Sequence, residues 1–85
     1  MTPFTVDWLP DALDMLADIW TQASDRSAVT AAQNRIDKML ARDPLGSGKE
    51  VHELLYQLIE PPLTVSYSVD QPRKIVEVAA ISYSP

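Results

Sequence analysis

The stretch Leu63–Ile81, LTVSYSVDQPRKIVEVAAI, most strongly limits what this chain can fold into. Its first half, up to Asp70, alternates apolar and polar residues, which is typical of a β-strand with one face toward a core. Asp70-Gln71-Pro72-Arg73 has the composition of a tight turn. Ile75–Ile81 is almost continuously apolar, as expected of a strand covered on much of both faces. We therefore predict two antiparallel strands joined by this turn.

The segment Val51–Ile59, VHELLYQLI, fits two structures. Its leucines fit one face of a helix, whereas alternate residues from His52 to Leu58 fit one face of a strand. Because it is short and ends at the double proline Pro61-Pro62, we predict a strand. A shorter strand is predicted at Phe4–Trp8, where β-prone residues alternate briefly.

A first helix is predicted to open at Leu9-Pro10, because proline is favourable in a first helical turn. We expect Trp20 to lie on its apolar stripe and both tryptophans to lie in the core. Asp11, Asp14 and Asp18 should form a solvated face on the other side of the helix. The apolar residues, which follow the helical period, are Leu9, Ala12, Leu13, Leu16, Ile19 and Trp20.

A second helix is predicted to begin near Ser24, Asp25 or Ser27, since each of these residues is a plausible N-cap. Asp43-Pro44 should end it, because the residue before a proline avoids the helical conformation. Leu45–Lys49 is expected to be a loop, and the two helices an antiparallel hairpin. The apolar stripe of the second helix consists of Val29, Ala32, Ile36, Met39 and Leu40.

The predicted order is β-α-α-β-β-β, an α+β fold in which the helical hairpin packs on one face of an antiparallel sheet. A chain of 85 residues, 1–85, is expected to form one domain. The chain has no cysteine, which excludes disulfides and thiolate metal sites and is compatible with a reducing cytoplasm. We see no signal peptide pattern at the N-terminus and no membrane-spanning apolar run, and so expect a cytoplasmic protein.

The formal net charge is −5, with twelve acidic residues against seven basic ones. Nucleic acids are bound mainly through clustered Lys and Arg, which displace counterions. The average field of this chain opposes binding to RNA or DNA, so direct nucleic-acid binding is not expected.

Three segments in this order resemble the RelE/ParE superfamily of bacterial toxins, the plasmid-stabilisation type. They are VDWLPDALDMLADIW, DRSAVTAAQNRIDKMLARDP and PPLTVSYSVDQPRKIVEVAAI, and together they cover nearly the whole chain. The resemblance implies the toxin of a type II toxin–antitoxin module, silenced by an antitoxin that wraps it. RelE-like members cut mRNA in the ribosome, whereas ParE-like members inhibit DNA gyrase.

The resemblance does not extend to the basic residues of RelE-like nucleases. At the matching positions this chain has Ile59-Glu60-Pro61, and Thr64 ahead of Ser66-Tyr67. RNA cleavage needs cations for the phosphate together with an acid and a base, so we expect a toxin that binds a protein, with gyrase as one possible target, or a degenerate one. The alternatives are a ribosome-dependent mRNA endonuclease and a non-toxic interaction domain. The catalytic candidates are His52, Tyr67, Arg73 and Tyr83.

Arg35, Lys38 and Arg42 recur at helical spacing and form a basic stripe on the second helix. This stripe is either a solvated face, paired with Asp37 and the acids of the first helix, or a docking strip for an acidic antitoxin segment or a target. Arg73 and Lys74, at the predicted turn, are further candidates for partner binding. With one histidine and only two glycines, the chain offers no metal site and no phosphate-binding loop, and we expect no cofactor. We expect the antitoxin to occupy an apolar groove between the helices and the sheet.

Overall fold

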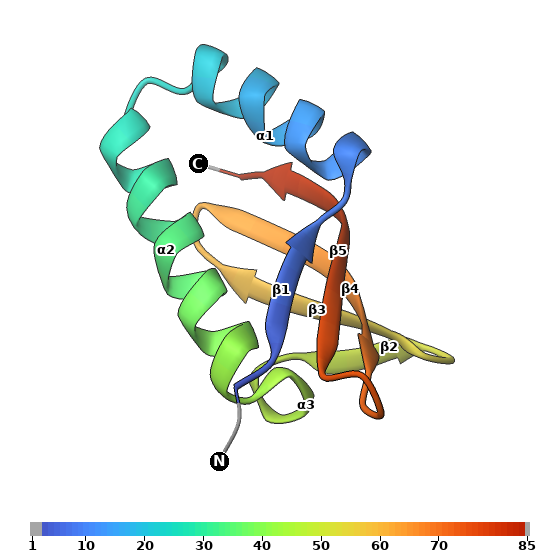
Figure 1. The fold of residues 1–85 in the computed structure, drawn as a ribbon. Helices are drawn as coiled ribbons and strands as arrows, with labels where there is room; N and C mark the ends of the chain where they lie inside the picture. Colours follow the sequence, from blue (N-terminus) through green and yellow to red (C-terminus); the bar gives the residue numbers. More distant parts are fainter. Residues whose placement is uncertain (1–2, 85) are drawn as a thin grey trace.

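A five-stranded sheet with the strand order β1-β5-β4-β3-β2 organises the computed structural model, which describes residues 3–84 (Figure 1). β1 is an edge strand parallel to β5, and the other neighbours are antiparallel. The α+β architecture is confirmed, but the sheet is mixed and has one more strand than predicted. The elements are β1 (Thr5–Trp8), α1 (Pro10–Gln22), α2 (Arg26–Arg42), α3 (Pro44–Ser47), β2 (Lys49–His52), β3 (Leu55–Glu60), β4 (Leu63–Asp70) and β5 (Ile75–Tyr83).

One face of β4 is buried, as the alternation in its sequence predicts, and β5 is buried on the same face of the sheet. Ser66 pairs with Ala80 but Tyr67 pairs with Val78, so Ala79 is the extra residue of a β-bulge. The bulge shifts the alternation by one residue and returns Ile81 to the buried face. The other face of β5 is not buried, which corrects the expectation of a strand covered on both sides. The fully buried residues of the two strands are Leu63, Val65, Tyr67, Val76 and Val78.

The second helix, α2, forms as predicted and covers the buried face of the sheet. The side chain of Asp25 accepts a hydrogen bond from the backbone N–H of Ala28 at 3.0 Å, which identifies Asp25 as the N-cap. Beyond Arg42, the side chain of Asp43 caps a further short helix, α3, where a loop was predicted. The buried stripe of α2 consists of Val29, Ala32, Ile36 and Leu40.

The first helix, α1, packs mainly against β5 and contacts α2 less (Figure 1). The small side chains of Ala12 and Ala23 are buried together with Leu16, whereas Leu13 is 48% exposed and Trp20 is 45% exposed. The prediction of a core position for Trp20 is therefore wrong. No helix within residues 3–84 is long and apolar enough to cross a membrane.

The segment predicted as one strand, Val51–Ile59, forms two strands, β2 and β3, with a turn at Glu53-Leu54. The chain reverses because Leu54 adopts a left-handed backbone conformation with φ of 61°. The side chain of Glu50 supports the turn by accepting a hydrogen bond from the Leu54 N–H at 3.2 Å. Leu54 is 72% exposed, so the tip of this hairpin presents an apolar side chain to solvent.

The edge strand β1 is held to α2 by a side-chain hydrogen bond, which explains why Trp8 is half-buried. The indole N–H of Trp8 donates to the Asp37 carboxylate at 2.7 Å. A second link is the backbone N–H of Phe4, which donates to the carbonyl of Ala41 at 2.8 Å. β1 is therefore anchored from both the sheet and the helix.

We expect the substitution Asp37→Ala to lower the free energy of unfolding by about 1–2 kcal/mol, because it leaves the part-buried Trp8 N–H without its acceptor. Asp18→Ala is the matched control. Asp18 is exposed and has no hydrogen bond among the described residues, so its loss should change stability by less than about 0.5 kcal/mol. Urea unfolding measures both, and equal losses would argue against the bond.

Candidate functional site

A shallow groove lies where α1 meets the beginning of α2. It consists of two adjoining hollows of about 360 and 370 Å³, and both are lined by Trp20 and Thr30. We call it the Trp20 groove. The first hollow is further lined by Leu13, Leu16, Ala17, Thr21 and Gln33, and the second by Arg26, Ser27, Ala31 and Asn34.

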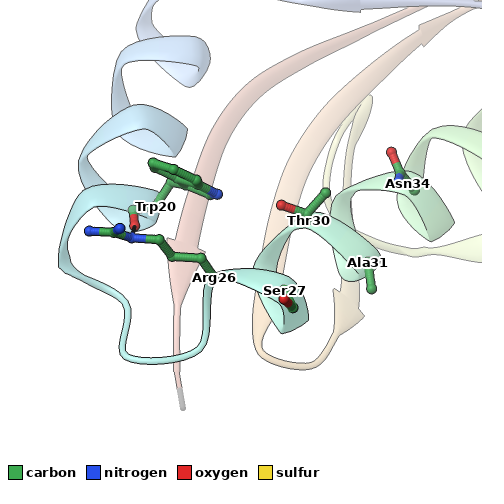
Figure 2. Close-up of a pocket in the computed structure, with 6 residues that line it drawn as sticks. All are labelled: Trp20, Arg26, Ser27, Thr30, Ala31 and Asn34. Carbon is green, nitrogen blue, oxygen red and sulfur yellow. Dashed lines mark hydrogen bonds between the residues drawn. The ribbon is translucent and has the colours of Figure 1, made fainter.

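Arg26 lines the second hollow and contacts Trp20, as Figure 2 shows. Its guanidinium carbon lies 4.6 Å from the centroid of the Trp20 ring, a cation–π contact. Its Nε and Nη2 donate to the carbonyls of Trp20 and Thr21 at 3.0 and 3.1 Å. These bonds satisfy carbonyls at the C-terminal end of α1, which lack partners within the helix. The indole of Trp20 is thereby held in place, projecting from α1 toward the first turns of α2 (Figure 2).

The two walls of the Trp20 groove differ in polarity. The α1 wall is mainly apolar, whereas the α2 wall is polar and presents neutral side chains such as Thr30 and Asn34 together with the cationic Arg26. Asp14 and Asp18 are exposed and directly follow the wall residues Leu13 and Ala17, so they border the groove on its α1 side. α1 contains three aspartates and no Lys or Arg. The groove is therefore apolar with an acidic border.

Tyr67, one of the catalytic candidates, is fully buried. Its hydroxyl donates to the Pro44 carbonyl at 2.6 Å, and its ring stacks on that of Tyr56 with centroids 5.6 Å apart. Burial, with a smaller contribution from Tyr56, raises the pKa of Tyr67 to about 12. Such a group does not exchange protons readily near neutral pH, and its contacts are those of a core residue.

The other three catalytic candidates lie apart from one another. Arg73, in the turn before β5, is 3.7 Å from Asp70, and Tyr83 is the last residue of β5. A strand of this length spans roughly 25–30 Å, so these two lie at opposite ends of the sheet. His52 is exposed at the end of the outer strand β2, where its Nδ1 accepts from the N–H of Glu53 at 3.0 Å. Their catalytic roles remain predictions.

Only part of the predicted basic stripe is free of hydrogen bonds to other side chains and carbonyls among residues 3–84. Arg35 donates to Glu60 at 2.7 Å and to the Pro61 carbonyl at 3.4 Å, and so ties α2 to the β3–β4 turn. Lys38 and Arg42 are exposed and make no ion pair among the described residues. Their role in partner binding remains a prediction.

Asp37, considered above as an ionic partner of the basic stripe, bonds to Trp8 instead. Lys74, at the β4–β5 turn, places its ammonium 4.6 Å from the centroid of the Phe4 ring. The partner-binding role predicted for Lys74 and Arg73 also remains a prediction.

The face of the sheet turned away from the buried core carries hydroxyls and carboxylates. Asp7 of β1 lies in register with Glu77 of β5, and both are exposed. Lys49, in the outer strand β2, is the only Lys or Arg in the five strands. Among the residues that the structure describes, no three His, Asp or Glu side chains are placed to hold a metal ion. This face therefore offers little positive charge to a phosphate.

Sequence reasoning missed the Trp20 groove and Arg26. Arg26 follows Trp20 by six residues across a loop, and no periodic pattern marks such a pair. The one available signal is the composition of α1, which combines an apolar stripe with three aspartates and no basic residue. That pattern alone predicts only a helix with a core face and a solvated face.

No protein-family model matches the chain, and no curated protein sequence matches it. Solved structures match well. A chain of the toxin–antitoxin complex RelBE2 from Mycobacterium tuberculosis is 19% identical, with a TM-score of 0.81 over 98% of this chain and 93% of that one. A chain of the archaeal RelE–RelB complex from Pyrococcus horikoshii is 15% identical, with a TM-score of 0.71 and coverages of 98% and 96%.

A chain of the chromosomal ParDE toxin–antitoxin system from P. aeruginosa is 14% identical, with a TM-score of 0.73 and coverages of 96% and 97%. The chain described here thus has the fold of the RelE and ParE toxins along nearly its whole length. The resemblance seen in the sequence is confirmed at the level of the fold.

Proposed function

We propose that this chain is the toxin-type component of a bacterial two-protein module, that it acts in the cytoplasm by binding a protein, and that an antitoxin-type protein is its cognate partner. The shared fold supports this proposal, since the similar structures include complexes of toxin with antitoxin. For a toxin that acts by binding a protein, the target would be an essential protein such as DNA gyrase. A toxin that cut ribosome-bound mRNA would instead need a nuclease site.

The observation that carries the proposal is the charge on the strands. Cleavage of RNA builds negative charge on the reacting phosphate, and fixed cations stabilise that charge. The five strands supply only Lys49, while Asp7 and Glu77 place two carboxylates side by side on the exposed face. Such a surface repels a polyanion, so binding of a protein is the better-supported activity.

Expression of the chain alone in a bacterial host should arrest growth while transcripts stay intact, and co-expression of the protein encoded beside it should restore growth. Growth is measured with and without induction, and transcript ends are mapped by primer extension. Arg73→Ala and Tyr83→Phe should arrest growth as strongly as the parent chain does. Ile36→Asp, which puts a carboxylate into the core, is the unfolded control.

Two results would contradict the proposal. Transcript cleavage that disappears in the Arg73 or Tyr83 variant would identify a ribosome-dependent nuclease. Normal growth despite soluble, folded protein would identify a non-toxic interaction domain.

A further inference from the structure

We infer that the Trp20 groove binds an amphipathic α-helix of a partner protein, and that this helix carries an apolar seam flanked by Lys or Arg. This inference deepens the proposed function. It rests on that proposal for one point, the identification of the partner as the antitoxin-type protein.

The shape of the groove and its apolar wall suit a helix. Leu13 and Trp20 lie two turns apart on α1, and both side chains are nearly half exposed. The thirteen residues of α1 extend about 20 Å, so the wall accommodates three to four turns of a partner helix. Exposed aromatic side chains are frequent anchors of protein interfaces.

Arg26 prepares this anchor for binding. Because its guanidinium contacts the indole and also bonds to the last carbonyls of α1, Trp20 is ordered before a partner arrives. A preordered side chain loses little conformational entropy on association.

The charges around the groove specify the chemistry of the partner. Asp11, Asp14 and Asp18 are exposed, and none of them forms an ion pair among the described residues. A partner helix with Lys or Arg along the flank above α1 complements this border, whereas one with Glu there is repelled. On the α2 wall, Thr30 and Gln33 are neutral, and the guanidinium of Arg26 is engaged with the Trp20 ring and two carbonyls. This wall therefore sets no such requirement.

This charge is the opposite of that predicted for a partner of the basic stripe. Lys38 and Arg42 are exposed on α2, and Lys38 lies opposite the buried Ile36 on the helical wheel. Lys38 lies one helical turn beyond the groove residue Asn34, and neither Lys38 nor Arg42 lines the groove. An acidic segment bound to this stripe would therefore lie beside the Trp20 groove rather than in it.

Other occupants fit the groove less well. A second copy of the chain could present the basic stripe of its α2 to the groove. However, no large apolar side chain of α2 is exposed in the described chain, so that helix would supply positive charge but no apolar seam. Contact between two α1 helices would bring six aspartates together. Nucleic acids and anionic membranes are repelled by the same border.

Two designed helical peptides test the inference with the full chain. Both have about 18 residues and the same leucine seam, and they differ only in carrying Lys or Glu on the flanks. Binding is followed by tryptophan fluorescence and by NMR chemical shifts. We expect the Lys peptide to bind about tenfold more tightly at low ionic strength, and this difference to shrink in high salt.

Matched variants test which residues of the chain cause the preference for the Lys peptide. Asp14→Lys combined with Asp18→Lys should reverse the preference toward the Glu peptide, and Trp20→Ala should weaken binding of both peptides. Glu77→Gln removes a distant exposed carboxylate and should leave the preference unchanged. Circular dichroism verifies that each variant is folded.

An unchanged preference in the charge-reversed variant, equal binding of the two peptides, or shifts confined to Lys38 and Arg42 would overturn the inference. So would a dimer, detected by sedimentation, that the charge reversal dissociates. Growth arrest without groove binding would refute only the groove, whereas groove binding without arrest would refute the proposed toxin function.

Discussion

Replacing Gly48 with alanine is expected to lower the free energy of unfolding by about 2–3 kcal/mol. A Cβ atom at Gly48 would lie 2.2 Å from the Tyr67 hydroxyl oxygen and 2.8 Å from the Gln57 carbonyl oxygen. The backbone of Gly48 has φ of −113°, which any residue adopts, so the expected loss is steric. Tyr67 is fully buried and cannot move aside without disturbing the core.

A double substitution identifies the cause of this loss. Tyr67→Phe alone should cost about 1–2 kcal/mol, because the Pro44 carbonyl loses its donor. In the Tyr67→Phe background, however, Gly48→Ala should cost about 1–2 kcal/mol less than in the parent chain, since the nearest clashing atom is gone. Thermal and urea unfolding of the four proteins complete the cycle. Strictly additive losses would show that the hydroxyl is not the obstacle.

Gly46→Ala is the matched control for this cycle. Its Cβ would also meet an atom at 2.2 Å, but that atom belongs to the exposed side chain of Asp43, which can rotate away. We therefore expect a loss of about 1 kcal/mol, limited to the cap that Asp43 provides to α3.

The second large effect is expected at alkaline pH. Burial raises the pKa of Tyr67 from its usual value near 10 to about 12, so the folded protein retains this proton where the unfolded chain has lost it. The resulting stability is fully present below pH 10 and is lost as the pH rises through about 12. Two pH units correspond to about 3 kcal/mol, a large part of the stability of a small domain.

Urea unfolding measured in steps from pH 9 to pH 12 detects this loss. Tyr67→Phe has no ionisable group at this position, so its stability should fall by about 2 kcal/mol less over the same range. Because the other titrating groups are shared by both proteins, their effects cancel in the difference. Parallel pH profiles would contradict the role given to Tyr67.

The parts of the fold predicted correctly are those where local periodicity and local end signals agree. α2 has one narrow stripe around Ile36 and an N-cap at Asp25, and β4 has clean alternation that leads into a turn at Asp70. The β2–β3 turn gave no such signal. It is made by Leu54 in a left-handed conformation, a position where glycine or asparagine would be expected. The parallel pairing of β1 with β5 joins residues too distant in sequence for local patterns to indicate.

The candidate site was harder to predict because its position depends on how two helices are placed. The apolar stripe of α1 is wide enough for more than one core contact, and its period alone does not select between Leu16 and Trp20. In the structure, the small side chains of Ala12 and Ala23 are buried and let α1 lie close to β5. That placement leaves Trp20 at the border of the core. Partial exposure of an apolar residue is thus a tertiary property.

The position of β5 also bears on how the protein is made. β5 lies between β1 and β4, yet it follows every other element within residues 3–84. During synthesis, β1 and the buried side of α1 cannot pack against β5 until Ile75–Tyr83 has left the ribosome. Until then the nascent chain exposes unpaired strand edges and apolar surface, which favour aggregation. Binding of chaperones is therefore expected to persist until translation of this last strand is complete.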